Sequence, residues 1–114
     1  MNPFDYSMCC QTVTAYRRGL EGVRRLVIPS CLWQEGERQE DDGLGNDRRG
    51  ELSLTVAGYA DIEVGDRVML GEGPQVEAES WIDFLIAYKS RLRVLKSVRP
   101  RRWIGRICHM EAGG

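Results

Sequence analysis

The chain has 114 residues, of which 42% are hydrophobic and 29% are charged, and these values are typical of one soluble globular domain. Its longest apolar runs are far shorter than a bilayer span, so no membrane segment is expected. The formal net charge of −1 hides an asymmetry, because residues 1–88 hold eight basic and sixteen acidic side chains, whereas residues 89–110 hold eight basic side chains and no acidic one.

The N-terminal segment, MNPFDYSMCC, has neither the basic region nor the apolar run of a secretory signal. We therefore expect the chain to stay in the cytoplasm where it is made, with Cys9, Cys10, Cys31 and Cys108 as thiols. No metal site is expected, because Cys9 and Cys10 are adjacent and no second close pair completes a zinc ligand set.

Two segments lack the periodicity of a strand or a helix. Residues 1–11 read as an arm that lies on a surface or on a neighbouring subunit. Residues 34–50 contain a single aliphatic residue, Leu44, and such a segment cannot bury enough surface to offset the entropy of ordering it. A long mobile loop is predicted, either a solvated insertion or a functional channel or interface loop. Its acidic residues are Glu35, Glu37, Glu40, Asp41, Asp42 and Asp47.

Short alternating segments predict most of the strands. They lie at residues 12–17, 23–33, 51–57 and 67–70, with turns at 19–22 and 65–66. Pro29 interrupts the second strand and implies an edge position or a bulge, because proline has no amide hydrogen. In the third strand Leu52, Leu54 and Val56 share one face, which predicts that this face is buried.

Residues 80–88 predict the one helix. Ser80 can cap it, and apolar side chains recur at helical spacing at Trp81, Phe84, Leu85 and Tyr88. We expect this face to pack over the sheet, with an exposed subunit contact as the alternative. The glycines before the helix do not form a phosphate loop, because no Lys-Ser/Thr pair follows them.

Residues 91–110 predict a basic C-terminal hairpin, with strands at 91–98 and 103–110 and a turn at 99–102 around Pro100. Its candidate binding residues are Arg91, Arg93, Lys96, Arg99, Arg101, Arg102 and Arg106. With Trp103 as a stacking ring, they can contact nucleic acid. An electrostatic seam with the acidic loop or helix of a neighbouring subunit explains them equally well. A solvated basic face is also common for any run of charges.

These elements predict a mainly β single domain, residues 1–114, that forms a small barrel or sandwich of about six short strands with one short helix. Catalysis is not expected. The only histidine, His109, adjoins Cys108, and neighbouring residues on a strand point to opposite faces. Clustered carboxylates occur only in the predicted loop, where they are not preorganised. No cofactor is expected.

The order of several segments carries a family resemblance. They are TVTAYRR (12–18), VIPSCLW (27–33), the polar loop, ELSLTVAG (51–58), GDRVMLGEG (65–73) and LRVLKSVRPRRWIGRICHMEAGG (92–114). This order resembles that of small neck proteins of tailed bacteriophages, of the head–tail joining or head-completion (stopper) type, including short prophage minor capsid proteins. The helix at 80–88 departs from the simplest of these proteins.

The resemblance implies a virion structural protein, assembled in the bacterial cytoplasm, whose ring of subunits closes the DNA-filled capsid and docks the tail. Implied partners are further copies of the chain and neighbouring neck proteins (connector and tail terminator), with packaged DNA as a further candidate. Residues 34–50 would then be a channel or interface loop, and residues 1–11 would reach a neighbour. The alternatives are a tail terminator or other neck or tail ring protein, and a small nucleic-acid-binding module.

Overall fold

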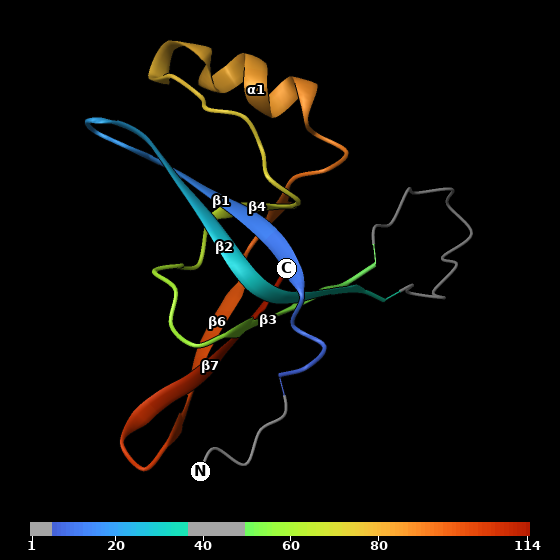
Figure 1. Ribbon diagram of the computed structural model, residues 1–114. Coiled ribbons are helices and arrows are strands. Elements are labelled where there is room, and N and C mark those ends of the chain that lie inside the picture. The colour runs from blue at the N-terminus through green and yellow to red at the C-terminus, as the bar shows by residue number, and fades with distance from the viewer. Residues whose placement is uncertain (1–5, 37–49) are drawn as a thin grey trace.

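The computed structural model describes residues 6–36 and 50–114, which form a curled antiparallel sheet with one short helix at its upper end (Figure 1). The strands are β1 (Gln11–Gly19), β2 (Gly22–Glu35), β3 (Leu52–Ala57), β4 (Arg67–Leu70), β5 (Arg93–Val94), β6 (Ser97–Trp103) and β7 (Arg106–Gly113). A 3-10 turn, η1 (Ala78–Ser80), leads into the helix α1 (Trp81–Ala87).

The seven strands lie in one sheet in the order β5-β4-β1-β2-β3-β7-β6. The two outermost strands, β5 and β6, are separated in the chain only by Leu95 and Lys96, so the sheet must curl to bring its ends together. The Lys96 amide donates to the Gly113 carbonyl of β7 at 2.6 Å, which fixes this corner. The sheet remains open. The predicted class, mainly β with one short helix, is confirmed.

Strand β2 is long because it changes partner along its length. It pairs with β1 from Gly22 to Ile28 and again at Cys31, and from Cys31 onward its other edge pairs with β3. Pro29 and Ser30 lie at an irregularity within the β1–β2 ladder, between its pairs at Ile28 and Cys31, and Ser30 has a φ of 59°. The bulge predicted from Pro29 is therefore confirmed, since an unpaired position tolerates a residue without an amide hydrogen.

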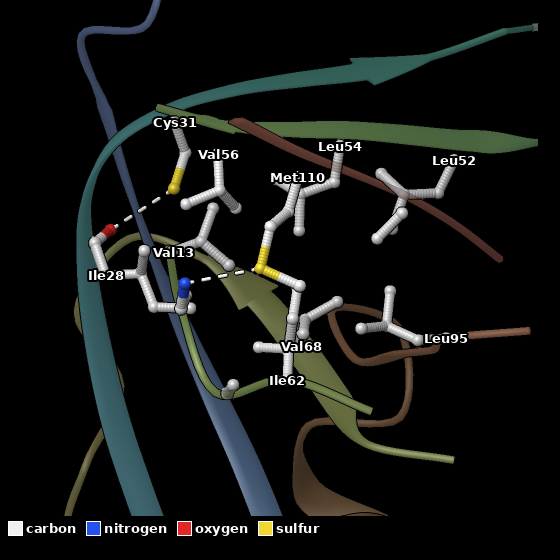
Figure 2. Packing of buried hydrophobic residues seen from close by; sticks show 13 residues of the cluster. Val13, Ile28, Cys31, Leu52, Leu54, Val56, Ile62, Val68, Leu95 and Met110 are labelled. Atoms are coloured by element: carbon white, nitrogen blue, oxygen red, sulfur yellow. Dashed lines mark hydrogen bonds between the residues drawn. The ribbon is translucent and has the colours of Figure 1, made fainter. Parts of the chain in front are cut away.

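The inner face of the sheet encloses the larger apolar cluster (Figure 2). It includes the predicted face of β3, in which Leu52, Leu54 and Val56 are all buried. The Cys31 thiol donates to the Ile28 carbonyl at 3.4 Å, and burial raises the pKa of Cys31 to about 12. Cys31 thus behaves as a small core side chain that stays protonated at neutral pH.

The helix covers the opposite face of β1 and β4. A second cluster joins Tyr16, Met69, Trp81, Phe84 and Leu92, with Leu85 and Tyr88 packed against it. The predicted apolar face of α1 therefore packs on the sheet, as expected. Ser80 stands at the N-cap position without a side-chain hydrogen bond, and its place in η1 explains why it does not cap the helix.

The predicted turn at residues 99–102 is wrong. Strand β6 continues through Pro100 to Trp103, because an edge strand tolerates proline. The chain turns instead at Ile104 and Gly105, whose φ values of 51° and 74° are of the sign that a two-residue hairpin loop requires at both positions. The predicted strand at 91–98 is also divided, into β5 and the beginning of β6.

Candidate interaction surfaces

The C-terminal hairpin projects from the sheet beyond its last neighbour. Strand β3 pairs with β7 only as far as His109, so the part of β6 and β7 nearest their turn is a two-stranded ribbon (Figure 1). Residues 102–106, called here the hairpin tip, are all exposed. They are Arg102, Trp103, Ile104, Gly105 and Arg106.

The candidate basic residues do not form one surface. Arg93 is largely buried, and its guanidinium donates to the carbonyls of Gly50 and Gly114 and pairs with Glu35 at 3.3 Å. The Arg91 guanidinium lies over the Tyr88 ring, 5.6 Å from its centroid. Both residues therefore stabilise the fold, whereas Lys96 is exposed in the corner between β5 and β6.

The remaining arginines follow β6 to the hairpin tip. Arg101 donates through Nε to the Glu111 carboxylate at 2.9 Å, so its charge is already paired. Across residues 6–36 and 50–114, neither Arg102 nor Arg106 has an ion-pair partner, and the same holds for Arg99. Charged residues and proline on an edge strand oppose unwanted strand pairing, which accounts for Arg99 and Pro100 without a ligand.

His109 connects the N-terminal segment to the sheet. Its neighbour Met110 faces the inner cluster, so His109 and Glu111 point to the other face of β7. The Tyr6 hydroxyl lies 2.9 Å from His109 Nδ1, and His109 Nε2 lies 3.2 Å from Glu111 Oε1. Hydrogen bonds from Arg101 and His109 lower the pKa of Glu111. The described part of the predicted arm therefore contacts its own chain, through Tyr6.

Only one of the acidic residues of the predicted loop falls within the described ranges. Glu35 is the last residue of β2 and forms the ion pair with Arg93. The loop prediction for the rest of the segment lies outside the described residues, together with Glu37, Glu40, Asp41, Asp42 and Asp47.

An exposed acidic and apolar surface on α1 was missed from the sequence. Ile82 and Ile86 are 65% and 69% exposed, although they are isoleucines one turn apart on a helix. Glu79 and Asp83 are exposed beside them. These four residues, called here the α1 outer face, could have been found from the i, i+4 spacing of the isoleucines, which falls outside the face formed by Trp81, Phe84, Leu85 and Tyr88.

A second ionic cluster lies at the start of β4 and has a structural role. The Arg17 guanidinium binds both carboxylate oxygens of buried Asp66, at 2.8 and 2.9 Å, and this contact raises the pKa of Arg17. Asp66 also accepts from the Glu63 amide at 2.9 Å. With three hydrogen bonds satisfying it, the Asp66 carboxylate fixes the turn before β4 and is not available to a ligand.

A hollow of about 560 Å³ lies beside Arg93, and residues 50–52 and 113–114 form half of its lining. Because the Arg93 guanidinium is engaged by carbonyls and Glu35, it offers no free charge there. In the described ranges no three His, Cys, Asp or Glu side chains gather where they could hold a metal. Within the same residues no helix has the length and apolar content to cross a membrane.

Comparison with protein-family models, with curated proteins and with solved structures found no match to this chain. Three features of the chain itself bear on its function: the hairpin tip, the α1 outer face and the order of segments along the sequence.

Proposed function

We propose that this chain is a structural subunit of a tailed-bacteriophage virion, a connector- or stopper-type neck protein that helps to close the DNA-filled capsid and dock the tail. The resemblance of its segments to small neck proteins supports the family. The hairpin tip supplies the structural support. The hairpin projects from the sheet (Figure 1), its tip exposes a tryptophan and an isoleucine, and the two arginines of the tip have no ion-pair partner among the described residues. Apolar side chains gathered on a projection are typical of a contact with another macromolecule.

The test is deletion of the gene from its phage or prophage, followed by induction and electron microscopy of the particles. We expect filled or leaking heads separated from complete tails, and restoration by the wild-type gene supplied in trans. Normal infectious particles from the deletion would contradict the proposal. Heads with DNA retained but tails of abnormal length would favour the alternative of a tail terminator.

A nucleic-acid-binding module is the second candidate, favoured by Trp103 between two arginines at the tip. It predicts binding to DNA or RNA at low salt, with a loss of about 0.7 to 0.9 log units in affinity per log unit of salt for each phosphate neutralised. Arg102→Glu should then weaken binding, whereas Arg93→Lys, at a buried arginine, should not change the salt dependence. Failure to bind at low salt would exclude this candidate.

A further inference from the structure

We propose that the hairpin tip of one copy docks on the α1 outer face of a second copy, a contact that rests on the proposed role as a subunit of an assembly and names its partner. Both surfaces expose large apolar side chains. Trp103 and Ile104 at the tip are 44% and 81% exposed, and Ile82 and Ile86 on α1 are exposed to a similar degree. Docking would remove all four from water, which is the main driving force of protein association.

The charges around the two apolar groups are opposite. The tip carries Arg102 and Arg106 and no acidic residue, whereas residues 77–83 carry Glu77, Glu79 and Asp83 and no basic residue. No ion pair within the described chain neutralises either arginine of the tip, and both acids of the α1 outer face are exposed. Complementary charges at the rim of an apolar contact steer the encounter and fix its register.

The two surfaces lie at opposite ends of the molecule (Figure 1). The tip cannot fold back on the helix of its own chain, because the sheet separates them. When two copies join through unlike surfaces, the pair still has one free hairpin tip and one free α1 outer face. Further copies can therefore bind, until the chain of copies closes into a ring or grows into a filament. This is the kind of contact that a ring of identical subunits needs.

Ile104 distinguishes this partner from nucleic acid. A β-branched residue at a φ of 51° is strained, and glycine, asparagine or aspartate would form the same turn without that cost. In the isolated chain the Ile104 side chain gains little stabilisation from burial, since it is four-fifths exposed. Burial against an apolar surface of a second copy would explain why isoleucine stands at this position. Phosphates would explain the arginines but neither Ile104 nor the acidic and apolar α1 outer face.

Charge reversal tests the contact with the full chain. The tip-reversed variant carries Arg102→Glu and Arg106→Glu, the helix-reversed variant carries Glu79→Arg and Asp83→Arg, and the third combines all four. We expect concentration-dependent self-association of the wild type at low salt in sedimentation velocity, weakened at least about tenfold in each single-surface variant, because like charges then face each other. The variant with all four substitutions should regain association, because opposite charges again face each other across the contact. Circular dichroism checks that each variant is folded.

A matched control is available at the β1–β2 turn, where Leu20 is fully exposed beside exposed Arg18. Arg18→Glu with Leu20→Ser should associate like the wild type. The proposed contact is wrong if the wild type remains monomeric at the highest concentration reached, or if the variant with all four substitutions does not recover self-association. The proposed contact is also wrong if the control variant loses as much self-association as the tip-reversed variant.

The same variants in the deletion strain separate this inference from the proposed function. If tip-reversed and wild-type genes restore particles equally while the deletion abolishes them, the neck role holds and this contact is wrong. If deletion leaves normal particles but association in solution follows the charge pattern, the contact holds and the neck role is wrong.

Discussion

Thr14, Tyr16 and Arg25 together hold the segment that follows β4. The Thr14 hydroxyl donates to the Gly71 carbonyl at 2.7 Å and accepts from the Gly73 amide at 2.9 Å. The Tyr16 hydroxyl donates to the Pro74 carbonyl at 2.8 Å, and Arg25 Nε donates to the Gly73 carbonyl at 3.0 Å. Buried polar groups are satisfied here by backbone, so this segment has a single position relative to β1.

Gly73 has no room for a side chain. A Cβ built on it would lie 2.1 Å from Tyr16 Oη and 2.7 Å from Met69 Sδ, and both side chains are fully buried. We expect Gly73→Ala to reduce the free energy of unfolding by about 1–3 kcal/mol, since the core must shift to accept a methyl group. Urea denaturation measures the change. Gly19→Ala is the control, because its nearest contact is 3.7 Å away, and an equal loss there would contradict the explanation.

The Arg101–Glu111–His109 contacts give stability a pH dependence. They lower the pKa of Glu111 from its ordinary value of 4.5, with the hydrogen bond from Arg101 as the largest cause. A lowered folded-state pKa contributes stability that is fully present above pH 4.5 and is lost as the pH falls through the folded value. Because Glu111 is half exposed, we expect less than about 1 kcal/mol.

Glu111→Gln provides the comparison. We expect it to be less stable than the wild type at pH 7 and the difference to be smaller at pH 3, because the wild-type carboxylate takes up a proton as the pH falls toward its lowered folded-state pKa. Thermal unfolding at the two pH values measures the difference. A gap between the two proteins that stays the same across this range would contradict the assignment.

At the scale of elements, α1 depends on its packing. A helix of seven residues does not persist alone in water, so α1 is held by the side chains it buries. The Phe84 ring lies 4.6 Å from the Tyr16 ring and 5.1 Å from the Tyr88 ring, measured between centroids. This cluster is the main connection between the helix and the sheet.

Phe84→Ala should therefore reduce the free energy of unfolding by about 3–5 kcal/mol, the usual range for truncation of a buried phenylalanine. Ile86→Ala, on the exposed side of the same helix, should change stability by no more than about 0.5 kcal/mol. Chemical denaturation of both variants makes the comparison. Similar losses would mean that α1 is held through its outer face even in the single chain, contrary to the structure.

Local patterns predicted most elements well and failed where the signal was ambiguous. Residues 67–70 form β4 as predicted, and α1 agrees with the predicted helix to within a residue at each end. The hairpin turn was misplaced because Pro100 is equally acceptable in a turn and on an edge strand, and only the strand order decides between them. The isoleucines of α1 were overlooked because the aromatic face alone sufficed to predict a helix.

At the scale of the whole molecule, the charge asymmetry of the sequence has a spatial meaning that the sequence could not provide. Eight basic residues within 89–110 suggested one basic surface, but the fold places Arg93 inside, Arg91 on an aromatic ring and Arg102 and Arg106 at the tip. Their separation follows from strand pairing between residues far apart in the chain, which no local pattern encodes. The opposition of the tip and the α1 outer face follows from the same pairing.

The corner at Leu95 and Lys96 also bears on how the protein is made. Residues 93–113 supply β5, which covers the edge of β4, and β7, which covers the edge of β3 and pairs in turn with β6. During synthesis the N-terminal strands leave the ribosome first, so β4 and β3 both wait with unpaired edges until this segment emerges. Unpaired edges invite pairing with other chains. A nascent or truncated chain that ends before residue 93 therefore exposes two unpaired strand edges, on β4 and β3, at which other chains can pair. Both edges are covered when the C-terminal segment is made and adds its strands to the sheet.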